Sequence, residues 1–337
     1  MKNCGRFVLM HKSFNLVIYI GGIMKKKNII IDCDPGIDDV VALCFAAANT
    51  DKFNILGITT VAGNQTIDKV TDNAIGLMSF LNSDIKIARG AKGPLIREKR
   101  PAINVHGENG VGDYEFPKSK ELYSNNAVTF LRDTIMASED KVTVVPVGPL
   151  TNIALLIKTF PEVMDKIEMF SIMGGAVWGG NTSGTAEFNV WADPEAARIV
   201  FDSKLPIVMS GLDVTHSCGL FRDDVNRLLK SEGKVSRMCG EILNFYFKGD
   251  HVKKGTFTPI HDACALMYLI HPELYKSRHM PVQVDCSEGL NRGNTACDVR
   301  EWIDYDETYP EVLLDVDLEK FREILLESLY NLDKTVK

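Results

Sequence analysis

The sequence contains the stretch Ile29-Ile30-Ile31-Asp32-Cys33-Asp34-Pro35-Gly36-Ile37-Asp38-Asp39, in which four aspartates follow three β-branched residues. Three consecutive isoleucines predict a strand buried on both faces, and Pro35-Gly36 predicts a turn at its carboxyl end. In open α/β sheets, ligands bind outside the carboxyl ends of the strands. Because four neighbouring carboxylates repel one another, we expect this acidic turn, residues 32–39, to bind a divalent cation or a polyhydroxyl ligand.

The alternative explanation for these aspartates is a helix N-terminus after the turn, which also attracts carboxylates. The helix dipole stabilises a nearby carboxylate by only about 0.3 to 1 kcal/mol, which is too little to offset the repulsion among four of them. We therefore favour a metal site. Calcium suits hard oxygen ligands in a flexible loop, whereas magnesium requires a stricter octahedron and usually phosphate partners, so the expected ion is Ca²⁺.

The composition is typical of a globular protein that binds a small molecule. The chain has 337 residues, of which 45% are hydrophobic and 25% charged, and its formal net charge is −7. This acidic balance argues against a nucleic-acid partner or an anionic membrane surface. No stretch approaches the ~18 to 20 apolar residues of a membrane span. The eight cysteines form no CxxC pair, so we expect reduced thiols and a cytoplasmic protein.

The first 23 residues weakly resemble a signal peptide, because two basic residues precede an apolar run. Lys12 interrupts that run, and no small-x-small cleavage site follows it. Met24 would be a natural start just before the first predicted strand. We interpret residues 1–23 as an N-terminal extension that is not part of the fold, with a targeting segment as the alternative, and residues 24–337 as a single domain.

Along the rest of the chain, predicted strands alternate with predicted helices. The periodicity predicts helices over residues 40–49, 66–82, 126–138, 150–159, 194–203, 261–270 and 318–332, a mainly helical segment over 222–250, and strands over 55–61, 85–88, 142–147, 167–173, 207–210, 282–285 and 312–316. Asp193 is the expected cap of the helix over 194–203. Residues 90–125 are predicted to form a long loop. The alternation predicts an open, mostly parallel α/β sheet with crossover helices on both faces.

A polar loop over residues 175–193 follows one of the predicted strands. It interleaves amide and carboxylate side chains with two tryptophans: Asn181, Glu187, Asn189 and Asp193, with Trp178 and Trp191. Paired donors and acceptors next to aromatic faces suit the hydroxyls and the ring of a sugar. The loop therefore predicts a polyol pocket, and a solvated surface loop is the alternative.

Two histidines are further candidates. His261 and Asp262 begin a predicted apolar helix, where a histidine can be structural, can complete a metal shell with its neighbour, or can pass a proton to a leaving group. His106 lies in the Gly-rich stretch 105–110, which fits either a surface turn or an active-site lid. The sequence has no P-loop, GxGxxG fingerprint, GxSxG elbow or HExxH motif, so nucleotide hydrolysis by a P-loop and hydride transfer lose their usual support.

These motifs together resemble the inosine-uridine preferring nucleoside hydrolases, also called ribonucleoside hydrolases. The acidic turn is the most specific match, and the resemblance extends over about residues 27–332. The other matching segments are residues 60–64, 105–108, 148–152, 186–189 and 193–196, and His261-Asp262. The resemblance implies the nucleoside hydrolase fold, calcium-dependent hydrolysis of the N-glycosidic bond of a small-molecule ribonucleoside, and a homodimer or homotetramer.

The resemblance also implies a metal site and its general base. Asp34, Asp39, Asp262 and the backbone carbonyl of Thr151 would hold Ca²⁺, and Asp32 would support them. Asp34 would in addition take a proton from the attacking water.

By the same resemblance, other residues would bind the nucleoside. Asp38 and Asn189 would bind the ribose 2′-hydroxyl, Asn64 and Asp262 the 3′ side, and Asn181 and Glu187 the 5′-hydroxyl. His261 would assist the departing base, and His106 would lie on the loop that closes over it.

Two other functions remain open at this point. A non-catalytic nucleoside or sugar-binding protein could keep the same pocket without turnover. A metal-dependent phosphatase also carries a DxD turn, but Pro35-Gly36 stands where such an enzyme would have a threonine nearby. The sequence does not decide between purine and pyrimidine bases.

Overall fold

The computed structural model describes residues 25–98, 102–117, 119–247 and 256–336. The expected N-terminal extension lies outside these residues. An eight-stranded sheet forms the centre, in the order β3-β2-β1-β4-β5-β6-β12-β9. Its strands are β1 Lys27–Cys33, β2 Phe53–Thr60, β3 Ile87–Arg89, β4 Val142–Pro146, β5 Ile167–Met173, β6 Ile207–Ser210, β9 Tyr275–His279 and β12 Glu311–Val316.

All neighbouring strands of this sheet pair in parallel except β12 and β9, which are antiparallel. The predicted mostly parallel sheet is thus confirmed. Two small antiparallel pairs lie beside it: β7 Gly219–Phe221 with β8 Phe257–Pro259, and β10 Val282–Val284 with β11 Thr295–Cys297. β1 lies inside the sheet between β2 and β4, so the acidic turn leaves the sheet from an interior strand.

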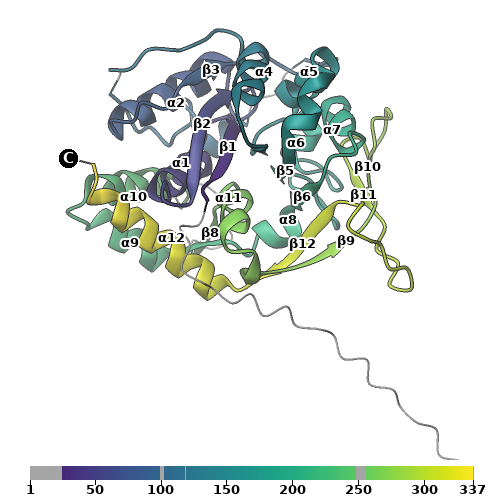
Figure 1. Cartoon of the computed structure of the whole chain (residues 1–337). Helices are drawn as coiled ribbons and strands as arrows, with labels where there is room; N and C mark the ends of the chain where they lie inside the picture. The colour runs from purple at the N-terminus through teal and green to yellow at the C-terminus, as the bar shows by residue number, and fades with distance from the viewer. Residues whose placement is uncertain (1–24, 99–101, 118, 248–255, 337) are drawn as a thin grey trace, which may run out of the picture.

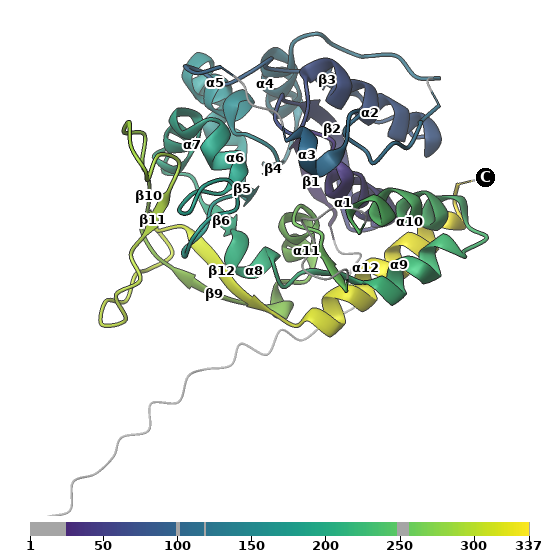
Figure 2. The same ribbon diagram turned by 180° about the vertical axis from the view of Figure 1, so that it is seen from behind.

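Helices cover both faces of the sheet (Figures 1 and 2). The helices are α1 Ile37–Ala48, α2 Ile67–Phe80, α3 Ile103–His106, α4 Ala127–Ala137, α5 Thr151–Thr159, α6 Phe188–Ala192, α7 Pro194–Phe201, α8 Leu212–Thr215, α9 Arg222–Leu229, α10 Lys234–Tyr246, α11 Ala263–Ile270 and α12 Leu318–Asp333. On one face α5 packs against α4 and α7, and on the other α1 packs against α10, α11 and α12. None of the helices that the structure describes is long and apolar enough to cross a membrane.

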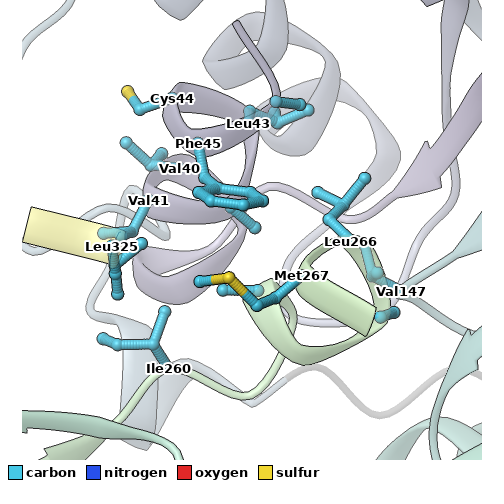
Figure 3. Close-up of a cluster of buried hydrophobic side chains, with 14 of the residues drawn as sticks. Val40, Val41, Leu43, Cys44, Phe45, Val147, Ile260, Leu266, Met267 and Leu325 are labelled. Atoms are coloured by element: carbon cyan, nitrogen blue, oxygen red, sulfur yellow. The ribbon is translucent and has the colours of Figure 1, made fainter. Parts of the chain in front are cut away.

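The central strand β1 is buried on both faces, as its three isoleucines predict. Ile29 and Ile31 belong to the hydrophobic core under α1 and α12, whereas Ile30 belongs to the core under α4, α5 and α7. Figure 3 shows Phe45 of α1 close to Leu266 and Met267 of α11 in the first of these cores. The packing of α1 against α11 brings together the starts of two helices that carry predicted site residues, Asp38 and Asp39 in the first turn of α1 and Asp262 just before α11.

Most predicted elements are confirmed within one to three residues at each end. The strands over 167–173 and 207–210 have the predicted bounds, and the cap is confirmed because Asp193 Oδ1 accepts a hydrogen bond from Ala196 N at 3.1 Å. The sequence did not predict β9, an edge strand whose Lys276 and Ser277 are exposed. An edge strand has one side open to solvent, so it can be formed by mostly polar residues and lacks the apolar pattern that predicts a strand. It also did not predict the short elements α3, α6, α8, β7, β8 and β11, and α3 lies within the stretch 90–125 that was predicted to be a loop.

The core between α1 and α11 gives a first testable expectation. Phe45 is fully buried, so we expect Phe45→Ala to lower the free energy of unfolding by about 3 to 5 kcal/mol, because it loses apolar burial and leaves a cavity. Urea unfolding at one fixed protein concentration measures this change. Leu290→Ala is the control: its side chain is 94% exposed, and its effect should stay within about 0.5 kcal/mol. Equal effects of the two substitutions would contradict the packing described here.

Candidate active site

The candidate site lies at the carboxyl ends of the parallel strands. The acidic turn follows β1, Asn64 follows β2, Gly148 follows β4 and the polar loop follows β5. Asp38 and Asp39 occupy the first turn of α1, and Asp262 precedes the first residue of α11. These positions bring together side chains from across the sequence at the edge of the sheet where α/β proteins bind ligands.

Backbone donors hold the carboxylate of Asp39. Its Oδ1 accepts a hydrogen bond from Asp34 N at 3.1 Å, and its Oδ2 accepts one from Gly36 N at 2.9 Å. The side chain of Asn64 also donates to Asp39 Oδ2 at 3.2 Å. Asp39 therefore fixes the conformation of the turn that carries Asp34.

The side chain of Asp34 is enclosed by two glycines. Its Oδ2 accepts a hydrogen bond from Asn64 N at 2.7 Å, whereas its Oδ1 is buried and has no hydrogen-bond partner among the described residues. A Cβ on Gly148 would lie 2.5 Å from Oδ1, and a Cβ on Gly63 would collide with Oδ2. The chain therefore keeps space for this carboxylate only by having no side chain at either position. A buried oxygen without a partner is an available ligand or proton acceptor.

The acids as a group fit a divalent cation. One carboxylate oxygen each of Asp38, Asp39 and Asp262 lie within 4.8 Å of one another, and all three residues are buried. Burial raises the pKa of Asp39 to about 7, and burial together with neighbouring carboxylates raises the pKa of Asp34 and of Asp262 well above the ordinary range. Burial and mutual repulsion thus make the ionised carboxylates unfavourable. A divalent cation bound among them would offset both costs, because its positive charge attracts the carboxylates and replaces the water that they lose on burial.

Asp32 lies within β1, just before the acids that could bind the cation. Its Oδ1 accepts hydrogen bonds from the hydroxyl of Thr59 and from Asn152 Nδ2, the latter at 2.7 Å. Burial nevertheless raises its pKa to about 7. Asp32 thus ties the end of β1 to β2 and to α5.

Thr151 is the first residue of α5 and is buried. Its hydroxyl donates to Asp193 Oδ2 at 2.6 Å. Just before α5, Gly148 borders Asp34, because a Cβ on Gly148 would lie 2.5 Å from Asp34 Oδ1.

The polar loop forms the other side of the site. Glu187 accepts hydrogen bonds from Gly175 N and Asn189 N, both at 2.9 Å, and burial raises its pKa to about 7. Asn189 Nδ2 donates to the carbonyl of Val147 at 2.9 Å, which joins the loop to the end of β4. Asn181 is exposed, and its Oδ1 accepts from Phe188 N at 2.9 Å. Glu187 and Asn189 are therefore joined directly, and Asn181 holds the backbone between them at Phe188. Asp193 instead accepts hydrogen bonds from Thr151, Leu95 and Ala196.

His106 reaches the acidic turn. Its Nδ1 accepts a hydrogen bond from Ile37 N at 3.1 Å, so Nδ1 carries no proton and the neutral ring bears its proton on Nε2. Burial lowers the pKa of His106, which favours this neutral form. The hydroxyl of Tyr246 lies 3.4 Å from Nδ1 and donates to Asp38 Oδ1 at 3.1 Å. Tyr246 thus joins the site from α10.

His261 lies next to the same acids. Its Nδ1 is 2.8 Å from the hydroxyl oxygen of Thr215, and its ring meets that of His216 edge to face at 5.7 Å. Burial lowers the pKa of His261 to about 4, so the ring is neutral near pH 7. The sequence did not single out Thr215, His216 or the hydroxyl of Tyr246. Thr215 and His216 do follow the carboxyl end of a predicted strand, which is the signal that points to them.

The family model described as inosine-uridine preferring nucleoside hydrolase matches residues 29–323. The chain belongs to this family. It is 41% identical over 277 residues to the pyrimidine-specific ribonucleoside hydrolases RihB of Shigella sonnei (strain Ss046) and Escherichia coli (strain K12), and the match covers 82% of this chain and 88% of each relative. The resemblance inferred from the acidic turn is therefore confirmed.

Solved structures of nucleoside hydrolases have the same fold as this member of the family. A plant nucleoside hydrolase superposes with a TM-score of 0.83 at 28% identity, covering 90% of this chain and 99% of that one. A purine-preferring ribonucleoside hydrolase from Gardnerella vaginalis superposes with a TM-score of 0.83 at 30% identity, covering 91% and 99%. The expected α/β nucleoside hydrolase fold is thus confirmed.

The buried acids predict how metal and pH affect stability. Asp32 and Asp39 have a pKa of about 7 in the fold, above the ordinary value of about 4 in an unfolded chain. The fold keeps these protons where the unfolded chain has lost them, so stability falls as the pH rises through about 7. We expect the chelated protein to melt at a lower temperature at about pH 8.5 than at about pH 7.3. An unfolded histidine, with a pKa of about 6.5, is already mostly neutral in this range and contributes little.

Calcium should raise the melting temperature at both pH values and reduce the difference between them, because the cation takes the place of the protons. Thermal unfolding followed by circular dichroism, at one protein concentration in chelator or in calcium, measures both effects. A chelated protein that melts at the same temperature across this range would contradict the expectation.

Proposed function

We propose that this nucleoside hydrolase cleaves the N-glycosidic bond of ribonucleosides with the help of Ca²⁺, releasing the free base and ribose for nucleoside salvage. The observation that carries the proposal is the convergence of Asp34, Asp38, Asp39 and Asp262 at one edge of the sheet, opposite two neutral histidines. The acids suit a sugar that becomes cationic, and the histidines suit a base that becomes anionic.

The charge of the site favours the transition state over the substrate. Cleavage of an N-glycosidic bond passes through a ribosyl group that resembles an oxocarbenium ion. Carboxylates around the sugar stabilise this developing positive charge more than they stabilise the neutral nucleoside, and only such differential binding accelerates the reaction. The low-dielectric surroundings of the buried acids strengthen the effect.

Asp34, Asp39 and Asp262 are the side chains that we assign to calcium. The free Oδ1 of Asp34, the orientation of Asp39 by backbone donors and the proximity of Asp39 to Asp262 support this assignment. Bound calcium would orient the ribose hydroxyls and lower the pKa of a water molecule. The backbone carbonyl of Thr151 stays in our assignment. We add that of Val147 as a further candidate ligand, because Val147 follows β4 and precedes Gly148, which borders Asp34.

Asp34 is the proposed general base. Its Oδ2 is already occupied by Asn64 N, whereas Oδ1 is free to take the proton of the attacking water. The enclosure by Gly63 and Gly148 holds the carboxylate in one orientation, which is what an efficient proton acceptor needs.

The ribose hydroxyls fit the polar groups around the acids. We assign Asp38 and Asn189 to the 2′-hydroxyl and Asn64 and Asp262 to the 3′ side. Asn181 and Glu187 on the polar loop are assigned to the 5′-hydroxyl. Asn189 contacts the end of β4, and Asn64 donates to Asp39, so both amides already lie beside the acids.

His261 is the group that we assign to the departing base. Because its ring is neutral near pH 7, it acts by donating a hydrogen bond to the base as the bond to the sugar breaks. His106 is the last residue of α3, and because its Nδ1 accepts from Ile37 N it carries its proton on Nε2; we propose that it contacts the base as well.

The preferred base, purine or pyrimidine, is inferred from the relatives. The relatives at 41% identity are named pyrimidine-specific, and the structural neighbour at 30% identity is named purine-preferring. The higher identity supports pyrimidine ribonucleosides as the preferred substrates of this chain. The homodimeric or homotetrameric state and the cytoplasmic location stay predictions.

A panel of nucleosides with and without chelator tests the proposal. We expect release of free base from uridine and cytidine, slower release from inosine and adenosine, and loss of activity in chelator that calcium restores. Chromatography of the free base and a reducing-sugar assay measure the two products. Binding of nucleosides without release of base would favour the sugar-binding alternative, and phosphate release from nucleoside monophosphates would favour the phosphatase.

Substitution of the general base gives the sharpest single prediction. Asp34→Ala removes the proton acceptor and a calcium ligand, so kcat for the best nucleoside should fall by about 100- to 10,000-fold or more. Asp51→Ala is the control, because Asp51 is exposed in the turn between α1 and β2 and should leave kcat unchanged. An Asp34 variant with nearly normal turnover would refute the assignment.

A further inference from the structure

Thr215 and His261 come from segments that are far apart in the sequence and meet at the candidate site. Thr215 is the last residue of α8, which follows β6, and its side chain is fully buried. His261 lies just before α11, and the segment between β8 and α11 brings it to α8. Their contact joins Oγ1 of Thr215 to Nδ1 of His261 at 2.8 Å. No motif in the sequence predicts this pair.

The hydrogen bond determines where His261 can carry its proton. A neutral imidazole has one N–H, and the nitrogen opposite it is an acceptor. Among the described residues, Nδ1 is the ring nitrogen of His261 that is engaged, so Nε2 is left for a ligand. Only a ring with the proton on Nε2 can donate to a departing base, and that form requires Nδ1 to accept from the Thr215 hydroxyl.

We propose that Thr215 is a positioning residue that donates a hydrogen bond to His261 Nδ1 and thereby keeps the Nε2–H form directed at the departing base. This inference rests on the proposed function, because it gives His261 the leaving-group role. The contact with His216 supports it, because a second ring packed edge to face at 5.7 Å limits rotation of the His261 ring.

The reaction balances with His261 as a hydrogen-bond donor. The bond between C1′ and the base nitrogen breaks, and its electron pair passes to the base. The oxygen of water bonds to C1′, and its proton goes to Asp34. The base finally acquires a proton when the products leave, so His261 keeps its own. Thr215 acts only on the stability of the departing anion.

The test separates the hydroxyl from the shape of the side chain. Thr215→Val keeps the volume and removes the donor, whereas Thr215→Ser keeps the donor. With the full-length, calcium-loaded enzyme and its best nucleoside, we expect Thr215→Val to lower kcat by about 10- to 100-fold with little change in KM. Thr215→Ser should restore kcat to within about threefold of the wild type.

The leaving group gives a second measurement. In 4-nitrophenyl β-D-ribofuranoside the departing phenolate is a stable anion that needs no donor. Thr215→Val and His261→Ala should therefore lower kcat for this substrate by less than about threefold, although His261→Ala lowers kcat for the nucleoside by about 100- to 1,000-fold. The double variant should be no slower on the nucleoside than His261→Ala alone, because Thr215 acts through His261.

Thr143→Val is the matched control. Thr143 is also fully buried, and its hydroxyl donates to Glu168 at 3.2 Å. Both residues lie near the amino ends of β4 and β5, whereas the acids lie at the carboxyl edge of the sheet, so the loss of this hydroxyl should leave kcat unchanged on both substrates. Normal nucleoside turnover in Thr215→Val, or equal losses on both substrates, would overturn the inference while the hydrolase assignment stands. A wild-type enzyme that releases no base, or a fully active His261→Ala variant, would instead overturn the proposed function itself.

Discussion

The site depends on the repulsion among carboxylates that the fold buries at the carboxyl end of β1. Burial and neighbouring carboxylates raise the pKa of Asp34, Asp39 and Asp262, so their surroundings favour protons or a cation, and Asp38 lies among them. Backbone N–H groups and the Asn64 amide hold the acids in place but do not neutralise them. The same unbalanced negative charge that costs stability is what a ribosyl cation needs.

The sheet provides the rigidity that keeps these charges together. β1 lies inside the sheet with isoleucines in both cores, so the acidic turn starts from a strand that is fixed on two faces. α1 and α11 pack together in one core, and each begins with a carboxylate of the site. The apolar packing between α1 and α11 therefore sets the distances between the carboxylates at the starts of these two helices.

The sequence was sufficient for the acidic turn, the parallel sheet and the cap at Asp193, because each depends on residues close together in the chain. It was insufficient where distant segments meet. The contacts of Tyr246 with Asp38 and of Thr215 with His261 arise only from tertiary packing. The strand β9 was missed because an edge strand needs little apolar character.

The long sequence separation within the site bears on how the protein matures during synthesis. Tyr246 and Asp38 are in contact although they lie 208 residues apart, and Asp262 is farther along still. A nascent chain therefore exposes its first aspartates on the ribosome long before their partners emerge. Until α11 is made, the early acids can remain hydrated, and the penalty for dehydrating them falls on the last stage of folding. A cation that binds the completed site would then stabilise the last stage of folding as well as take part in the reaction.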